Sequence, residues 1–203
     1  MPKKQDYLKS ICIRHYNAGN HRKPSRKELV GCDLYSDITE MYRSLGGKLE
    51  TVPLNIGSYD IDLKDFIIEL DEENHFNRYR SETLRSPLYD NDWKNFNVAD
   101  YKQYCEKYEG GCLTYGKYWG TPSSDKQFGI SSPNKDLAGV GASRWRQRAF
   151  YDFVKDVYSI VANVPIIRVS IYDIYKTNTI HALIQQEQEN EILEYIENRV
   201  KIL

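Results

Sequence analysis

The spacing of apolar residues predicts three helices at the start of the chain. Residues 6–17 place apolar side chains at helical intervals and are followed by an Ala-Gly-Asn sequence that ends a helix. A second helix begins at Ser25, which has the spacing of a capping box to Glu28. A third begins at residue 36 or 37 and stops at Gly46-Gly47. Three helices therefore precede the first strand.

The pattern then changes to alternation, which predicts a β-hairpin. Residues 49–63 have the texture of extended chain, and residues 66–72 have the Ile and Phe content of a strand. A two-residue turn at Lys64-Asp65 would pair Asp60 with Glu69, with Cβ atoms about 5 Å apart. The hairpin then has an acidic face of Asp60, Asp62, Glu69 and Asp71 and an apolar face of Ile61, Leu63, Phe66, Ile68 and Leu70.

The rest of the chain supplies the other elements of an α/β fold. Residues 76–86 and the stretch from Ser143 to about residue 161 are helical, residues 166–172 form a buried strand, and one or two helices follow from residue 179. The helix after Ser143 is the expected crossover that brings the last strand beside the first strong one. The order α-β-β-α-β favours a mixed central sheet flanked by helices.

We expect a single domain over residues 1–203, since this length suits one sizeable core. Its parts are a helical start (1–48), the hairpin (49–86), an insertion (87–141) and a last part of core helix, strand and C-terminal helices (142–203). The insertion is rich in Tyr, Trp and Gly and shows little period of either kind. It is therefore expected to be a long decoration, partly mobile around residues 121–136.

Composition narrows the class of protein without choosing a function. No run of about 18 apolar residues and no secretory segment is present, so we expect a cytoplasmic protein with no membrane contact. Four cysteines without a CxxC pair are expected to be reduced, and a zinc site at Cys105 and Cys112 stays open as an alternative. The net charge of −1 hides a basic N-terminal end, which suits a phosphate-binding arm or a merely solvated helix.

The acidic face of the hairpin is the strongest chemical signal. Carboxylates crowded on one face resist ionising together, so they favour a shared divalent cation, Mg²⁺ with Mn²⁺ able to substitute. Asp60 and Glu69 would be ligands together with the main-chain carbonyl of Leu70, and Asp71 or His75 would assist. Asp62 stays open as the first ligand in place of Asp60. The alternative for the whole face is a solvated sheet edge.

The segment Glu69-Leu70-Asp71-Glu72-Glu73-Asn74-His75, after an upstream Asp60, resembles the PD-(D/E)XK nuclease superfamily and its very-short-patch-repair endonuclease branch. The resemblance implies a restriction-endonuclease-like core and gives Asp60, Glu69, Asp71, His75 and, in an N-terminal helix, Glu40 roles in catalysis. Asp71 stands at the position where many members of this superfamily have the lysine of the motif, so that lysine is missing here. Proton transfer would then fall to His75, to water or to a lysine from elsewhere such as Lys155.

The resulting hypothesis is a magnesium-dependent endonuclease that hydrolyses DNA, used in restriction, repair or defence. DNA is the expected partner, and a homodimer is compatible with the sequence. The residues expected to contact nucleic acid are Arg78, Arg80, Arg144, Arg146 and Arg148. Two alternatives stay open: a catalytically inactive nucleic-acid-binding or interaction protein on the same fold, and a metal enzyme acting on a small phosphoester.

Overall fold

The computed structural model describes residues 4–21, 23, 25–90, 96–115 and 119–201, and these contain helices interspersed with short strands. The α-helices are α1 (Lys4–Tyr16), α2 (Arg26–Val30), α3 (Tyr35–Ser44), α4 (Arg78–Thr83), α5 (Val98–Tyr115), α6 (Pro122–Phe128), α7 (Ser143–Val161), α8 (Ile180–Gln185) and α9 (Glu189–Val200). Two short 3₁₀ helices are η1 (Glu73–His75) and η2 (Pro87–Asp90). The strands are β1 (Ile61–Asp62), β2 (Ile67–Asp71), β3 (Ile166–Ser170), β4 (Ile174–Tyr175) and β5 (Asn178–Thr179). The chain is therefore a mixed α/β protein.

The predicted hairpin is present in the predicted register. β1 runs antiparallel to β2 with Asp62 opposite Ile67. The turn is closed by the Leu63 N–H, which donates to the Phe66 carbonyl at 3.1 Å. The strands are shorter than the alternation suggested, because β1 contains only two residues. Asp60 therefore lies just before the strand rather than inside it.

β2 is the central strand of a three-stranded mixed sheet, in the order β1-β2-β3. β3 runs parallel to β2 and places Arg168 opposite Glu69 and Ser170 opposite Asp71. Parallel neighbours need a crossover, and α7 enters β3 through a short turn, so the predicted crossover helix is confirmed. β4 and β5 form a separate two-stranded hairpin that the sequence did not predict.

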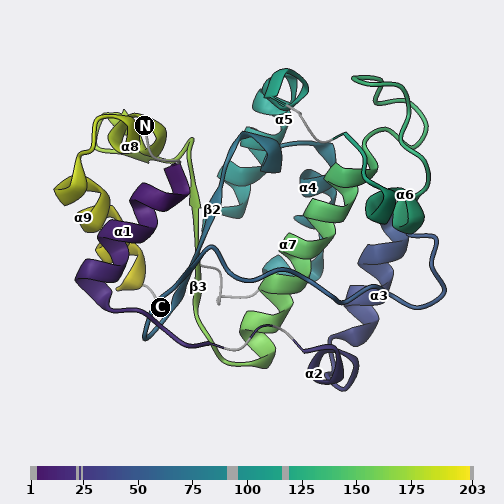
Figure 1. Cartoon of the computed structure of the whole chain (residues 1–203), viewed down its shortest axis with the longest axis horizontal. Coiled ribbons are helices and arrows are strands. Elements are labelled where there is room, and N and C mark those ends of the chain that lie inside the picture. Colours follow the sequence, from purple (N-terminus) through teal and green to yellow (C-terminus); the bar gives the residue numbers. More distant parts are fainter. Residues whose placement is uncertain (1–3, 22, 24, 91–95, 116–118, 202–203) are drawn as a thin grey trace.

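Helices cover both sides of the sheet. Figure 1 shows α1, α8 and α9 on one side of β2 and β3, and α7 with α3, α4 and α6 on the other. α1 buries Leu8, Ile11 and Cys12, which are the positions expected from its helical spacing. Every residue of β2 and β3 is buried as a result. The alternative that the acidic hairpin face is a solvated edge is therefore wrong, since Glu69 and Asp71 are 2% and 1% exposed.

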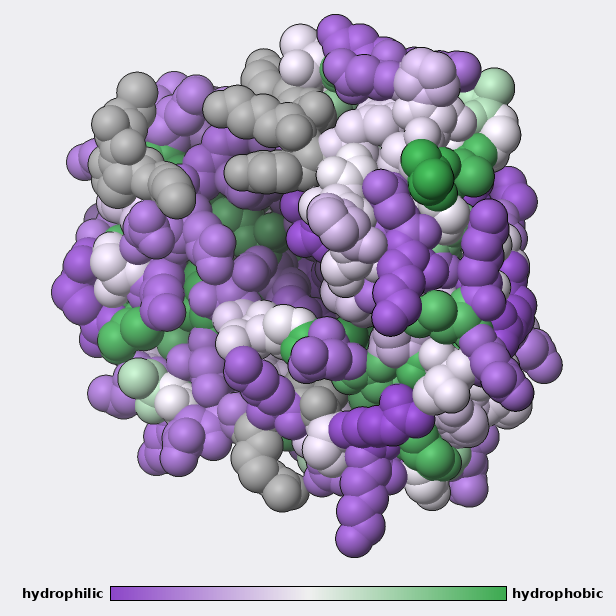
Figure 2. Space-filling model, turned by 45° about the vertical axis from the view of Figure 1, so that its right-hand side comes forward, coloured by the Kyte–Doolittle hydropathy of each residue, from purple (hydrophilic) through white to green (hydrophobic). Residues whose placement is uncertain are grey.

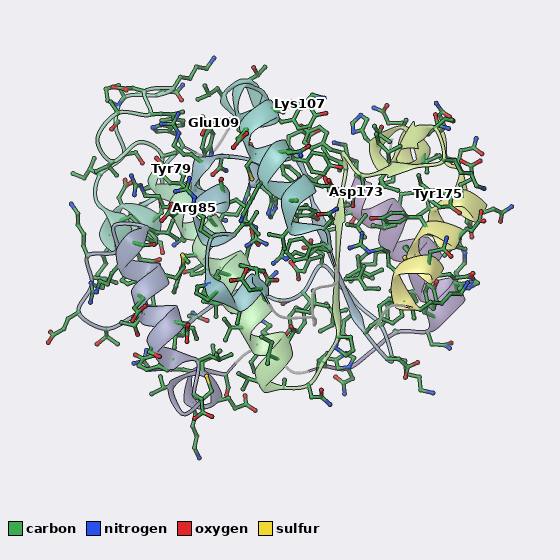
Figure 3. All side chains as sticks on the ribbon, turned by 180° about the vertical axis from the view of Figure 1, so that it is seen from behind. Tyr79, Arg85, Lys107, Glu109, Asp173 and Tyr175 are labelled. Atoms are coloured by element: carbon green, nitrogen blue, oxygen red, sulfur yellow. The ribbon has the colours of Figure 1, made fainter. Side chains whose placement is uncertain are left out.

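Residues 87–141, in which the sequence shows little period, contain regular helices. Most of the described part of this segment folds into η2, the 18-residue helix α5 and the helix α6, whose N-terminus has a capping box from Thr121 to Ser124. Seen from behind in Figure 3, Lys107 and Glu109 of α5 lie near the top of the view, above Arg85 and Asp173. α5 also packs its tyrosines against the core, where the rings of Tyr108 and Tyr172 stack with centroids 3.6 Å apart. The aromatic surplus thus serves packing here.

Hydrophobic residues on the surface are scattered. Figure 2 shows one face on which they form small separate patches among hydrophilic residues. Among the described residues, the large exposed ones are Val30, Ile130, Ile160 and Ile174. Of the helices described, none is both long and apolar enough to cross a membrane.

Candidate functional site

The predicted acids Asp60 and Glu69 meet in a pocket of about 350 Å³ at the junction of the sheet and α7. Asp60, just before β1, and Glu69 of β2 form its acidic floor, and one side of α7 forms a wall. The pocket is lined by Gln5, Gly57, Asp60, Glu69, Leu70, Glu72, His75, Arg144, Arg148, Tyr151, Asp152 and Lys155. Acidic and basic groups thus face the same space from opposite elements.

Asp60 and Glu69 are tied to each other through the hairpin backbone. The Asp60 N–H donates to Glu69 Oε1 at 3.2 Å, and the Leu70 N–H donates to Asp60 Oδ2 at 2.9 Å. Gln5 from α1 donates to the other Asp60 oxygen at 3.2 Å. The two carboxylates are therefore fixed side by side. Asp62 does not line this pocket, because the His21 backbone N–H donates to it at 2.9 Å, so Asp60 is the acid that the structure places beside Glu69.

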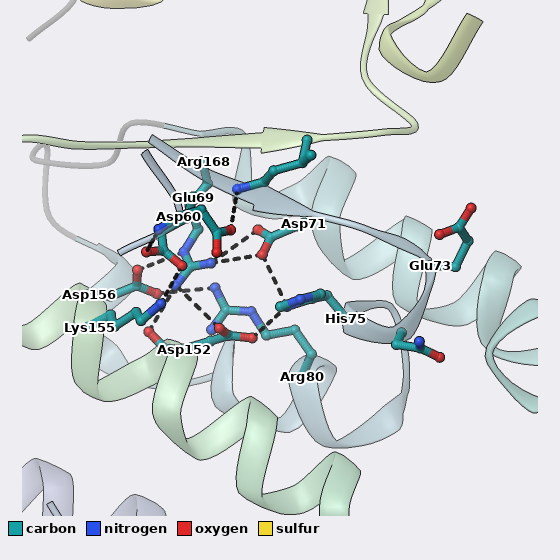
Figure 4. Close-up of polar contacts among 12 residues, drawn as sticks. Asp60, Glu69, Asp71, Glu73, His75, Arg80, Asp152, Lys155, Asp156 and Arg168 are labelled. Atoms are coloured by element: carbon teal, nitrogen blue, oxygen red, sulfur yellow. Dashed lines mark hydrogen bonds and ion pairs between the residues drawn. The ribbon is translucent and has the colours of Figure 1, made fainter. Parts of the chain in front are cut away.

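Lys155 of α7 reaches Glu69, beside Asp60, and completes a triad of titratable side chains (Figure 4). Its Nζ donates to Glu69 Oε2 at 2.6 Å. Burial raises the pKa of Glu69 to about 8, and Lys155 opposes that rise. Burial also raises the pKa of Asp60, again against the pull of Lys155. Burial works to lower the pKa of Lys155, but Glu69 and Asp60 more than offset it, so the pKa is raised and the ammonium stays charged.

His75 lies beside this triad and is held by two other acids. Its Nδ1 is 2.8 Å from Asp152 Oδ2 and 3.1 Å from Asp71 Oδ1. Asp71, His75 and Asp152 are the group of side chains in the described residues whose atoms are close enough to bind one metal ion. Asp71 is fully engaged, however, because Arg168 Nη1 donates to both of its oxygens at 2.9 and 3.1 Å. Asp71 therefore does not face the pocket as a free ligand.

Behind His75 is a buried charge network that joins β2, β3, α4 and α7. Arg168 Nε donates to Asp156 Oδ1 at 2.7 Å, and Arg80 Nη2 donates to Asp156 Oδ2 at 3.1 Å. Both guanidinium groups are 1% exposed or less. Although burial opposes ionisation, His75 and the arginines hold the pKa of the Asp152 carboxyl well below its usual range.

α7 carries a line of cations along the pocket wall. Arg144, Arg148 and Lys155 are separated by four and seven residues, so they lie on one side of the helix. Arg144 donates to Gln147 Oε1 at 2.6 Å. Burial and the neighbouring Arg148 lower the pKa of Arg144. Within the described chain neither arginine has an acidic partner at ion-pair distance, so both are available to an anion.

The other predicted residues lie elsewhere. Glu40 is exposed and lines a separate surface pocket with Glu82 and Arg85, so the structure does not bring it to the site. Arg80 is buried on Asp156, and nucleic acid cannot reach it. Arg146 is committed to backbone carbonyls, including that of Leu45 at 2.7 Å, and lies over the Tyr79 ring.

Arg78 is half-exposed but forms a bidentate ion pair with Glu109, with both hydrogen bonds at 2.8 Å. Of the five arginines expected to contact nucleic acid, only Arg144 and Arg148 line the pocket. All four cysteines are free. Cys112 donates to the backbone carbonyls of Glu73 and Phe76, and neither it nor Cys105 belongs to the metal-type group, so the zinc alternative has no support.

Sequence reasoning missed Gln5, Tyr151, Asp152 and Arg168. Asp152 had a usable signal, because it lies four residues after Arg148 and three before Lys155 on a helix already predicted. Arg168 is the one charged residue in the strand sequence Ile-Ile-Arg-Val-Ser, which is otherwise apolar or small. A charge in a strand predicted to be buried calls for a buried partner. That signal could have been used.

The donor set at Asp60 and Glu69 fits a hard divalent cation. Mg²⁺ prefers oxygen ligands and keeps several waters, which needs carboxylates beside open space. Asp60 and Glu69 provide the carboxylates, and the pocket provides the space. The Leu70 N–H faces Asp60, and its carbonyl leaves the strand on the same edge, where it can serve as a third ligand. Asp71, His75 and Asp152 fit less well, because Arg168 already neutralises Asp71.

Comparison with known proteins gives a family but no activity. A search of curated proteins found no match, and neither did a search of solved structures. Residues 40–188, well over half of the chain, match a family of unknown function, DUF7255. This range includes the hairpin acids, His75, α7 and β3. The chain therefore belongs to the DUF7255 family.

Proposed function

We propose that the chain is a metal-dependent endonuclease that hydrolyses DNA phosphodiester bonds with Mg²⁺. The observation that carries this proposal is the meeting of Asp60, Glu69 and Lys155 in one pocket, with Lys155 bonded to Glu69 at 2.6 Å. Two acids and a lysine are the residue types of the PD-(D/E)XK motif, which the hairpin sequence resembles. Lys155 supplies from α7 the lysine that the motif lacks at Asp71.

The arrangement of the sheet supports the same interpretation. Both acids are at the hairpin, the central strand β2 has a parallel neighbour, and residues of the crossover helix α7 line the same pocket as the acids. A restriction-endonuclease-like core is the finer description that we propose for this mixed α/β fold. The substrate would approach along α7, where Arg144 and Arg148 can contact the phosphates on either side of the scissile one.

Hydrolysis requires that two protons move at the scissile phosphate. The water oxygen forms a bond to phosphorus and loses a proton, while the bond from phosphorus to the leaving oxygen breaks and that oxygen gains one. A bound Mg²⁺ would lower the pKa of a water and neutralise phosphate charge. The charged Lys155 can donate a hydrogen bond or a proton to the phosphate oxygens. His75, on the pocket wall, can exchange the other proton.

Plasmid cleavage tests the proposal directly. Purified protein with Mg²⁺, and separately with Mn²⁺, should nick supercoiled DNA. Glu69→Ala and Lys155→Met should each abolish it while circular dichroism still reports a folded chain. Glu82→Gln is the matched control, since it removes one carboxylate charge from a half-exposed side chain outside the pocket and should leave cleavage unchanged. Cleavage that persists in Glu69→Ala would overturn the proposal.

The same experiment separates the two alternatives. DNA binding in a mobility-shift assay without cleavage in either metal would indicate a catalytically inactive binding protein. Hydrolysis of a small model diester without cleavage of DNA would indicate a phosphoesterase for small substrates. The pocket volume of about 350 Å³ suits either a single nucleotide unit or a small ester, so this comparison is needed.

A further inference from the structure

The buried network beneath the pocket controls the proton position on His75. Nδ1 of His75 faces two carboxylate oxygens, Asp152 Oδ2 at 2.8 Å and Asp71 Oδ1 at 3.1 Å. If Nδ1 carried no proton, its lone pair would be repelled by the lone pairs of both carboxylate oxygens. If Nδ1 carries the proton, its N–H donates to these oxygens and is attracted to both. The two acids therefore keep the proton on Nδ1, whatever the state of the other ring nitrogen.

The other nitrogen, Nε2, is the one that can act in the pocket. His75 lines the pocket and its side chain is 18% exposed, whereas Asp71 is 1% exposed. Nε2 lies on the ring edge opposite Nδ1, and within the described chain it makes no hydrogen bond. A neutral ring with the proton on Nδ1 offers an Nε2 lone pair. Such a ring can accept a proton from water.

A single guanidinium fixes both acceptors. Arg168 Nη1 donates to both oxygens of Asp71, and Arg168 Nη2 donates to the backbone carbonyl of Asp152 at 2.9 Å (Figure 4). Arg168 is itself 0% exposed and is held from the other side by Asp156 at 2.7 Å. Asp71 thus cannot turn away from His75 without breaking a buried ion pair, and the same guanidinium anchors the backbone at Asp152, whose carboxylate lies 3.9 Å from Arg168 Nη2.

The charge of the network acts in the same direction. Asp71, Asp152 and Asp156 carry three negative charges, while Arg80 and Arg168 carry two positive ones, which leaves an excess of one negative charge beside His75. The groups that face His75 are Asp71 from β2 and Asp152 from α7, with Arg168 of β3 behind them. Asp60 is the acid on its pocket side.

We propose that Asp152 and Arg168 are positioning residues that lock His75 with its proton on Nδ1, so that Nε2 is the atom that accepts the proton of the attacking water. This inference rests on the proposed function, and it assigns to His75 the base in that reaction. The proton leaves the water oxygen as the bond to phosphorus forms, and it ends on Nε2. Asp152 and Arg168 touch neither substrate nor metal in this assignment.

Nuclear magnetic resonance of ¹⁵N-labelled imidazoles tests the assignment without any activity. The chain has four histidines, and the spectrum of His75→Gln identifies the signal of His75. In the unmodified protein at a pH where the ring is neutral, Nδ1 should carry the proton and Nε2 should be bare. In Asp152→Asn the ring should shift toward the opposite form, while Glu82→Gln should leave it unchanged. A proton on Nε2 in the unmodified protein would overturn the proposal, even if Asp152→Asn fails to fold.

Kinetics adds a second test that a merely structural role would not satisfy. If DNA is cleaved, Asp152→Asn should lower kcat about 10²-fold with KM nearly unchanged, since general-base catalysis contributes about 10²–10⁴-fold. An unchanged kcat would overturn the role of Asp152. The two proposals can also fail separately. If the proton is on Nδ1 but DNA is not cleaved, only the proposed nuclease activity is overturned. If DNA is cleaved but the proton is on Nε2, only the positioning role of Asp152 and Arg168 is overturned.

Discussion

Glu69 and Asp71 are two residues apart on β2, point to the same side of the strand and are 2% and 1% exposed, yet they have different surroundings. Glu69 faces an open pocket and one flexible lysine. Asp71 gives both of its oxygens to a buried guanidinium. The comparison shows that the partner, rather than strand position or burial, decides which acid stays available to a cation. Asp71 therefore has a structural role in a buried ion pair, and Glu69 is the acid that can bind a cation.

The largest expected effect is the loss of stability when the cationic partner of each acid is replaced, Arg168 for Asp71 and Lys155 for Glu69. Arg168→Met leaves the buried Asp71 without its guanidinium partner, while Asp156 keeps Arg80, and the loss should be about 3–5 kcal/mol of unfolding free energy. Lys155→Met should cost only about 1–3 kcal/mol, because Glu69, whose pKa is already raised to about 8, can take up a proton. Urea unfolding of both variants near neutral pH measures the two losses.

A variant of an exposed pair calibrates this measurement. Lys176→Met removes a salt bridge to Glu194 in which both side chains are 52% exposed, so the loss should be the smallest of the three because solvent screens this pair. Equal losses for Arg168→Met and Lys155→Met would contradict the distinction between the structural acid and the available one.

The pH dependence of stability should single out Glu69. Its pKa is raised from an ordinary value of 4.5 to about 8, so folding favours the protonated carboxyl. The stability that this group contributes is complete below about pH 4.5 and is lost as the pH rises toward 8, because the unfolded chain releases the proton in this range while the folded chain still holds it. The unfolding free energy of the unmodified protein minus that of Glu69→Gln should therefore fall over this window.

Denaturant titrations at several pH values measure this difference. Adding Mg²⁺ should reduce the fall at the alkaline end, because the ion binds the ionised carboxylate in the folded chain. If the difference in unfolding free energy between the unmodified protein and Glu69→Gln rises with pH instead, Lys155 has a larger effect than burial on the pKa of Glu69. Glu69 would then be a structural acid like Asp71.

The arginines of α7 offer a smaller effect that sharpens the comparison. Arg148 lines the pocket, whereas Arg146, two residues earlier, is bound to the carbonyls of Leu45 and Val140 at 2.7 Å each. Arg148→Gln should weaken DNA binding and reduce the slope of log K against log salt by about 0.7–0.9, the loss of one phosphate contact. Arg146→Gln should lower thermal stability and leave the salt slope unchanged. Equal slopes in the two variants would exclude Arg148 from the interface.

Much of the fold was predictable because it depends on apolar spacing. α1, α3, α7 and β3 appear where the sequence placed them, and the hairpin register followed from the two-residue turn. Lys155 was already a candidate, because the acid motif lacked its lysine. α5 was missed although Tyr101, Cys105, Tyr108 and Cys112 recur at helical spacing. Tyrosine was not counted among the apolar residues that define helical spacing, and a glycine pair such as Gly110-Gly111 is more typical of a turn than of a helix interior.

The sequence signals that Arg168 needs a buried partner, but which acids pair with it was beyond sequence reasoning for a physical reason. Arg168 and Asp71 are 97 residues apart, and their ion pair exists only because β2 and β3 are parallel in one register. A shift of one residue would turn Arg168 to the other face. The prediction that Arg80 contacts DNA was wrong for the same reason, since spacing alone does not reveal that Asp156 lies opposite it.

The smallest expected effect concerns Glu40, which the sequence placed in the site. The structure puts Glu40 on the exposed side of α3, beside Glu82 and Arg85 and outside the pocket of Asp60 and Glu69. Glu40→Gln should therefore leave cleavage within about twofold and stability within about 0.5 kcal/mol, as expected for an exposed position without a buried partner. Plasmid cleavage and thermal unfolding, run beside Glu69→Gln, check both. A loss of cleavage comparable to that of Glu69→Gln would mean that DNA extends from the pocket across α3 and that the substrate-binding surface is wider than α7 alone.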